Sequence, residues 1–180
     1  MDTDPTDPDS FGAYTNPNTG RLANSHGTHV ASTIGAKNNG ADVNGFGIKV
    51  LPIKVLGDLV VGQGGSLDAI INGINYASGI LTYSNVSIPA SEGPVKVINM
   101  SLGSVRSSCS NSYQQAINDI YSRGITLVAA SGNDAQEYPG SYGYPASCNN
   151  VISVGALDVV QQRSYYSTYN DQVDIAAPGG

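Results

Sequence analysis

The sequence contains no tryptophan and little charge, since Asp, Glu, Lys and Arg make up only 12% of its 180 residues. Lys and Arg are the scarcer group, 8 against 14 Asp and Glu, and the net charge of −6 offers no basic surface for nucleic acid. No apolar run approaches the roughly 20 residues that a membrane-spanning helix requires. We therefore expect neither a nucleic acid nor a membrane as a partner.

Cysteine is also scarce. Cys109 and Cys148 form no Cys-x-x-Cys pair, and two thiols alone do not identify a cellular compartment. Apolar residues are abundant, at 40%, and there are 22 glycines, a composition typical of a compact and loop-rich globular protein.

The length of the sequence suits one domain over residues 1–180. Residues 1–23 hold four Asp and three Pro with almost no apolar periodicity, so we expect a loop-rich segment without signal-peptide features there.

Apolar runs alternate with helical patterns along the rest of the chain. The predicted strands are residues 50–56, 95–102, 125–131, 151–157 and 173–177. The predicted helices are residues 67–78 and 112–123; the second is capped by Ser110 or Asn111, ends at Gly124 and has a core face of Tyr113, Ala116, Ile117, Ile120 and Tyr121. Continuous apolar strands that alternate with amphipathic helices indicate an α/β fold whose parallel sheet is covered on both faces.

A short histidine-bearing helix is predicted over residues 24–36. Asn24 and Ser25 are suitable capping residues, which places His26 in the first turn, and Val30 and Ile34 form its apolar side. The positive end of a helix disfavours the imidazolium form, so His26 is suited to act as a general base. Gly27 leaves room for another chain beside that ring. His26 and His29 are equally compatible with two hydrogen-bonded surface residues or with two metal ligands.

Three polar segments follow predicted strands: Ser101-Leu102-Gly103, Ser131-Gly132-Asn133 and Ala177-Pro178-Gly179. Ligands of a parallel α/β sheet bind beyond the carboxyl ends of its strands. Each segment by itself also has the composition of an ordinary turn.

Taken in order, these segments resemble one known family. His-Gly-Thr-His-Val-Ala from His26, Val-Ile-Asn-Met-Ser-Leu-Gly from residue 97, Ala-Ala-Ser-Gly-Asn from residue 129, Val-Ile-Ser-Val-Gly-Ala from residue 151 and Asp-Ile-Ala-Ala-Pro-Gly from residue 174 are similar to motifs of the subtilisin-like serine proteases, the subtilases. The resemblance runs from Ser25 to the end of the chain. It implies a subtilisin-like three-layer α/β fold, incomplete here, with a mostly parallel central sheet and helices on both faces. It also implies a serine-type endopeptidase acting on extended polypeptide.

The resemblance assigns roles to individual residues. His26 is the catalytic base, Asp2 the carboxylate that orients it, and Asn133 the amide of the oxyanion hole. An edge segment before the predicted helix at 67–78 is expected to pair with the substrate backbone, and it contains Gly62, Gly64 and Gly65. Two further segments are expected to form the walls of the pocket for the residue before the scissile bond. One wall is Ser101, Leu102 and Gly103, and the other is Ala130, Ser131 and Gly132.

The resemblance also bears on metal, disulfide and location. No cofactor is required for the chemistry, but Asp9 and Asn39 correspond to oxygen ligands of a structural calcium in many subtilases. A disulfide between Cys109 and Cys148 is expected, because secreted subtilases with similar flanking sequences carry cysteines at both places and the two loops join neighbouring elements. The alternative is two buried thiols in a cytosolic protein. The resemblance favours a secreted monomer.

One subtilase motif is not found. The nucleophilic serine of the family lies in Gly-Thr-Ser-Met, downstream of Ala-Pro-Gly, and no serine of this sequence stands in that context. We therefore expect these 180 residues to lack peptidase activity on their own. The alternative is a non-catalytic pseudoprotease domain that binds extended peptides. A metal protein using His26 and His29 lacks a third ligand signal and is the weakest alternative.

Overall fold

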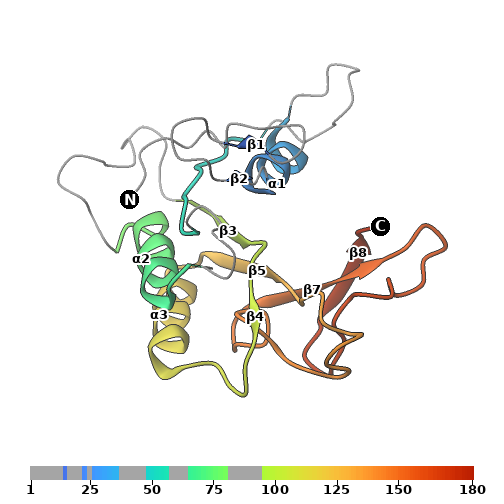
Figure 1. Cartoon of the computed structure of the whole chain (residues 1–180). Coiled ribbons are helices and arrows are strands. Elements are labelled where there is room, and N and C mark those ends of the chain that lie inside the picture. Colours follow the sequence, from blue (N-terminus) through green and yellow to red (C-terminus); the bar gives the residue numbers. More distant parts are fainter. Residues whose placement is uncertain (1–13, 16–21, 24–25, 37–47, 57–64, 81–94) are drawn as a thin grey trace. The chain divides into compact units, whose positions relative to one another are not determined.

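The computed structural model describes residues 14–15, 22–23, 26–36, 48–56, 65–80 and 95–180 (Figure 1). The chain divides into two compact units, Met1–Gly73 and Ile74–Gly180, and each is described by itself. The predicted single domain over residues 1–180 stays a prediction. No helix within the described ranges is both long enough and apolar enough to span a bilayer.

The first unit is built around α1 (His26–Gly35). Before it, β1 (Tyr14–Thr15) pairs antiparallel with β2 (Leu22–Ala23), a short ladder within the segment predicted to be loop. The predicted histidine-bearing helix is confirmed over His26–Gly35, but no residue of α1 is buried and its apolar side is half-exposed.

The strand predicted over residues 50–56 is wrong. Residues 48–56 form no ladder with any described part of the chain, although they lie against glycines on both sides. A Cβ placed on Gly35 would lie 2.7 Å from Val50 Cγ2, and one placed on Gly73 would collide with Val55 Cγ1. Apolar character alone does not make a strand, because a strand also needs a partner for its backbone groups.

The second unit contains a four-stranded parallel sheet in the order β3-β5-β7-β8 (Figure 1). Its strands are β3 (Val97–Met100), β5 (Thr126–Ala130), β7 (Ile152–Leu157) and β8 (Ile175–Pro178). All four were predicted from apolar runs in the sequence, and the α/β class with a parallel sheet is confirmed. The strand order follows the chain order, so each crossover moves the chain one strand along the sheet.

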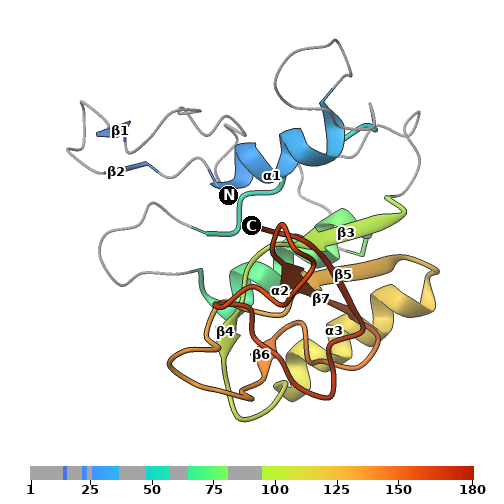
Figure 2. The same ribbon diagram turned by 90° about the vertical axis from the view of Figure 1, so that its right-hand side faces the viewer.

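Helix α3 (Asn111–Ser122) covers one face of this sheet, and the turned view shows it alongside β5 (Figure 2). Ser110 caps it, since the Ser110 hydroxyl accepts a hydrogen bond from the Tyr113 amide at 3.3 Å. Gly124, with a φ of +74°, ends it as predicted. Buried positions recur at helical spacing and comprise Tyr113, Ala116, Ile117 and Ile120.

Tyr121 was predicted to belong to this core face and does not, because its side chain is 55% exposed. It lies one residue beyond Ile120, which turns it about 100° away from the buried stripe. Helix α3 contacts β5, and the buried residues of the sheet include Ile98 and Met100 of β3 and Leu127 and Ala129 of β5. The Tyr113 hydroxyl lies 3.7 Å from Met100 Sδ, and burial raises the pKa of Tyr113 above its usual value.

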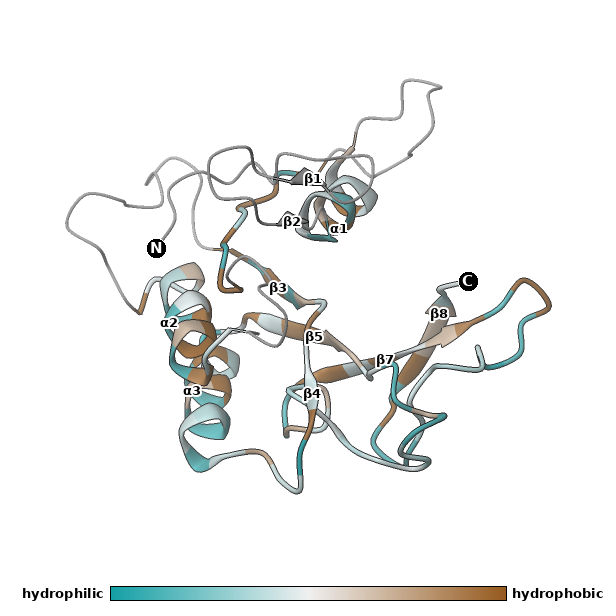
Figure 3. Cartoon of the chain, in the orientation of Figure 1, coloured by the Kyte–Doolittle hydropathy of each residue, from teal (hydrophilic) through white to brown (hydrophobic). Residues whose placement is uncertain are grey.

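Helix α2 (Leu67–Ala77) is also confirmed, and its last turn contributes Ile74, Tyr76 and Ala77 to the buried residues. Figure 3 shows the hydrophobic side of α2 and α3 and the hydrophobic residues along β7. The helical layer predicted for the second face of the sheet is not among the described elements of this unit. Val97 and Ile175, on the two outer strands, remain 56% and 59% exposed.

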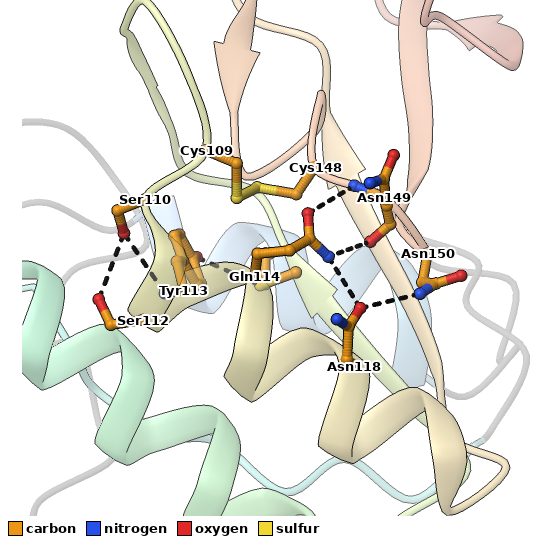
Figure 4. The surroundings of a disulfide bond; sticks show 10 residues. Cys109, Ser110, Ser112, Tyr113, Gln114, Asn118, Cys148, Asn149 and Asn150 are labelled. Carbon is orange, nitrogen blue, oxygen red and sulfur yellow. Dashed lines mark hydrogen bonds between the residues drawn. A yellow bond between two sulfur atoms is a disulfide. The ribbon is translucent and has the colours of Figure 1, made fainter.

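A disulfide joins Cys109 and Cys148, as the resemblance implied (Figure 4). Next to it, Gln114 of α3 exchanges two hydrogen bonds with the backbone of Asn149. Its Nε2 donates to the carbonyl at 3.0 Å and its Oε1 accepts from the amide at 2.9 Å. The start of α3 is thereby fastened to the loop that precedes β7.

We predict that Ile117→Ala lowers the free energy of unfolding by about 2–5 kcal/mol, because Ile117 is fully buried and the cavity does not refill. Ile175→Ala is the matched control, since the same truncation at a 59% exposed position should change stability by less than about 1 kcal/mol. Urea unfolding followed by circular dichroism measures both. Equal losses in the two variants would contradict the assignment of the core.

Replacing both cysteines by serine should lower the free energy of unfolding by about 4 kcal/mol, because the bond closes a loop with a sequence separation of 39 residues. The measurement is urea unfolding of the oxidised protein against the double variant, with Ser108→Ala as a neighbouring control. Peptide mapping without reductant must first show the bond; two alkylatable thiols in folded protein would disprove it.

Candidate active site

The carboxyl ends of β3 and β5 carry two of the predicted segments. After β3, the Asn99 side-chain amide donates to the Ser101 hydroxyl at 2.9 Å, which joins the strand end to the segment Ser101-Leu102-Gly103. After β5, the Ser131 amide donates to the Val154 carbonyl of β7 at 2.9 Å. The segment that follows β5 therefore starts from a backbone position fixed by the sheet itself.

A short strand that the sequence did not reveal contacts both segments. β6 (Gly143–Tyr144) pairs antiparallel with β4 (Ser104–Val105), which begins directly after Gly103. A Cβ placed on Gly103 would lie 3.1 Å from the Tyr144 carbonyl oxygen, and one placed on Gly143 would collide with the Ser131 carbonyl oxygen. The two predicted pocket walls are thus held against the same two-residue strand.

Asn133 is an exposed residue of the loop after β5. The residues around it are tied down: Ser131 is only 3% exposed, and Gly132 adopts a φ of +117° that favours glycine. The Asp134 amide donates to the Thr168 hydroxyl at 3.0 Å. An amide side chain is presented to solvent from a backbone with little freedom, which is the arrangement that an oxyanion-binding donor requires.

His26 lies in the first turn of α1 in the first unit and is exposed, as is His29. Within the part of the chain that the structure describes, no atom would lie within 4 Å of a Cβ added to Gly27. The room for another chain beside His26 stays a prediction. Among the described residues, no group of three or more His, Cys, Asp or Glu side chains is placed to hold a metal ion.

The remaining predicted residues divide into two sets. Gly65 is described, and it packs against the Val55 carbonyl and the Leu56 side chain, which gives this glycine a packing role; substrate binding there stays a prediction. Outside the described residues lie Asp2, Asp9, Asn24, Ser25, Asn39, Gly62 and Gly64. The triad aspartate and the calcium ligands therefore stay predictions.

Sequence reasoning missed Gly143 and Thr168. Gly143 stands in a stretch rich in Tyr, Gly and Pro that reads as loop, and nothing local shows that its missing side chain admits the Ser131 carbonyl. Thr168 lies between β7 and β8 among polar residues, where exposure is the ordinary expectation, yet it is 1% exposed. Both become visible only when distant segments meet.

The sequence matches a known protein family over almost its whole length. The profile of the Subtilase family matches residues 3–180. The chain belongs to the subtilase family. Its expected motifs, from the histidine helix to Ala177-Pro178-Gly179, all lie within the matched range.

Several proteases are similar to this subtilase in sequence. An extracellular protease of Xanthomonas campestris pv. campestris is 47% identical over 158 residues, which is 86% of this chain and 25% of that protein. Subtilisin Savinase of Lederbergia lenta is 39% identical over 158 residues, 87% of this chain and 51% of that protein. The chain thus spans about a quarter to a half of the length of these relatives.

A solved structure agrees with the fold. A protease from Pseudoalteromonas arctica PAMC 21717 aligns with a TM-score of 0.77 at 39% identity, covering 98% of this chain and 50% of the other. The subtilisin-like architecture is therefore supported by sequence and by three-dimensional similarity.

We predict that Gly143→Ala lowers the free energy of unfolding by about 1–3 kcal/mol, because the new methyl group is forced into the Ser131 carbonyl oxygen. Gly155→Ala in β7 is the control: its Cβ would find its nearest neighbour, Val173 Cγ1, at 3.4 Å, an ordinary contact. Thermal unfolding compares the two. An unchanged midpoint for Gly143→Ala would show that β6 does not support the wall.

Proposed function

We propose that this subtilase chain is part of a serine endopeptidase domain in which His26 is the general base and Asn133 stabilises the oxyanion. The observation that carries the proposal is the position of Asn133, exposed at the carboxyl edge of the sheet between residues that are all hydrogen-bonded in place. The names of the relatives, extracellular proteases among them, support proteolysis as the reaction.

The reaction begins with attack of a serine hydroxyl on the scissile carbonyl carbon. His26 accepts the hydroxyl proton as the serine Oγ bonds to the carbonyl carbon, and it returns that proton to the leaving amine when the C–N bond breaks. Negative charge develops on the carbonyl oxygen, and the Asn133 side-chain N–H donates to it. Asp2 orients the His26 ring in this proposal. The Gly-Thr-Ser-Met motif is not among the 180 residues, so the attacking serine enters as a group outside this sequence.

The substrate is polypeptide bound in an extended conformation. Its backbone pairs with the edge at Gly62, Gly64 and Gly65, as in strand addition to a sheet, and the side chain before the scissile bond lies between the walls on either side of β6. The fixed Ser131 backbone and the close approach of Gly103 to the Tyr144 carbonyl support these walls.

Secretion is part of the proposal, supported by the extracellular relatives and by the Cys109–Cys148 bond. We further propose a monomer with structural calcium at Asp9 and Asn39.

The decisive test uses this chain completed by the segment that follows the match in the Xanthomonas campestris relative, which is expected to supply the serine motif. In this completed domain Asn133→Ala should lower kcat about 10²–10³-fold, the loss found when a subtilisin loses its oxyanion amide. KM should change little, because the donor bonds the oxyanion and not the ground-state carbonyl. Asn111→Ala, an exposed position at the start of α3, is the matched control.

His26→Ala in the completed domain should lower the rate of hydrolysis of a chromogenic peptide to the small residual rate that oxyanion stabilisation and substrate binding alone provide. The 180-residue chain alone should give no hydrolysis with or without this substitution. Hydrolysis by the 180 residues that depends on His26 would overturn the assignment of the missing serine. Peptide binding without hydrolysis by the completed domain would favour the non-catalytic alternative.

A further inference from the structure

Thr168 is a loop residue with the burial of a core residue. It lies between β7 and β8, in the segment coloured orange-red in Figure 1, and is 1% exposed. Burying a hydroxyl and a backbone peptide is unfavourable unless their hydrogen bonds are made. The partners of Thr168 therefore show what this burial accomplishes.

All three polar groups of Thr168 bond to the loop that carries Asn133. The Thr168 amide donates to the Gly132 carbonyl at 3.0 Å. The Thr168 hydroxyl accepts from the Asp134 amide at 3.0 Å, and the Thr168 carbonyl accepts from the Ser131 hydroxyl at 3.0 Å. Residues on both sides of Asn133 are held by one residue, while Asn133 itself stays exposed.

Steric contact adds to these bonds at Gly132. A Cβ on Gly132 would lie 2.8 Å from the Thr168 hydroxyl oxygen and 3.1 Å from Asp134 Oδ2. Its φ of +117° is a second reason for glycine at this position. The backbone just before Asn133 is therefore confined by its own conformation and by the Thr168 side chain.

Thr168 is in turn anchored on the sheet. The neighbouring Ser167 hydroxyl accepts from the Ala156 amide of β7 at 2.9 Å. The guanidinium of Arg163 donates to the Ser167 carbonyl at 2.8 Å and lies over the ring of Tyr169, 4.3 Å from its centroid. The element that holds the Asn133 loop is thus tied to the strand next to β5, and displacement of the loop requires displacement of this support.

We propose that Thr168 is a positioning residue for the oxyanion amide: it holds Asn133 through Ser131, Gly132 and Asp134. The inference rests on the proposed function, because it concerns the same amide. Transition-state stabilisation by a fixed donor depends on the donor being in place before charge develops. A shift of about 1 Å in such a group is enough to lower a rate about 100-fold.

The structural part of the proposal is tested on the 180-residue chain. Thr168→Val keeps the shape and removes the acceptor of the Asp134 amide, so hydrogen exchange of that amide should accelerate at least about tenfold. Thr168→Ser keeps the hydroxyl and should retain protection. Thr126→Val, at an exposed position of β5, is the matched control. Unchanged exchange at Asp134 in Thr168→Val would overturn the proposal.

The catalytic part is tested in the completed domain. Thr168→Val should lower kcat about 10- to 100-fold with KM within about twofold, and Thr168→Ser should restore most of kcat. In an Asn133→Ala background, Thr168→Val should cause no further loss, because its effect acts through the amide. Ser131→Ala, which removes the bond to the Thr168 carbonyl, serves if the valine variant does not fold, and it should lower kcat in the same manner.

The outcomes separate this inference from the proposed function. The positioning role alone is overturned if Asn133→Ala lowers kcat as expected while Thr168→Val and Ser131→Ala both keep the wild-type kcat. Multiplicative losses in the double variant also overturn it, since they indicate a general structural effect. Wild-type kcat with Asn133→Ala overturns the proposed function and the positioning role together.

Discussion

The parallel pairing of β5 with β7 is the constraint on which the candidate site depends. The ladder aligns Ala130 with Val154, and the Ser131 amide extends it by donating to the Val154 carbonyl. Because parallel strands end at the same edge, the chain leaves β5 where the ends of its neighbours also lie. Asn133 lies three residues after the end of β5, so its location is set by the sheet and its orientation by the loop.

The interior next to this loop is stabilised by hydroxyl groups in addition to apolar packing. Ser131, Ser167 and Thr168 are each 3% exposed or less. Two of these hydroxyls accept from backbone amides: that of Ser167 from Ala156 of β7, and that of Thr168 from Asp134 of the loop after β5. Apolar burial is non-directional, whereas a hydrogen bond fixes distance and angle. A polar interior is therefore suited to a loop that must hold one side chain in a defined place.

Glycines serve the same end by allowing close approach. Gly143 admits the Ser131 carbonyl, and Gly132 admits the Thr168 hydroxyl. The loop after β5 is thus confined by β6 and by the segment before β8. The disulfide and the Gln114–Asn149 bonds act outside this loop, fastening α3 to the loop that leads into β7. These features together explain how loops of irregular structure present a site with little freedom.

Local sequence pattern was enough to predict the four strands of the sheet, the stripe from Tyr113 to Ile120 and the family motifs, and it narrowed the cap of α3 to Ser110 or Asn111. The pairing of Cys109 with Cys148 also followed from the resemblance. Packing between distant segments accounts for the rest: Tyr121 faces solvent, residues 50–56 form no strand, β6 pairs with β4, and Thr168 is buried against the neighbours of Asn133. Periodicity records which side of an element is apolar, whereas these outcomes depend on partners distant in sequence, and a local pattern carries no information about them.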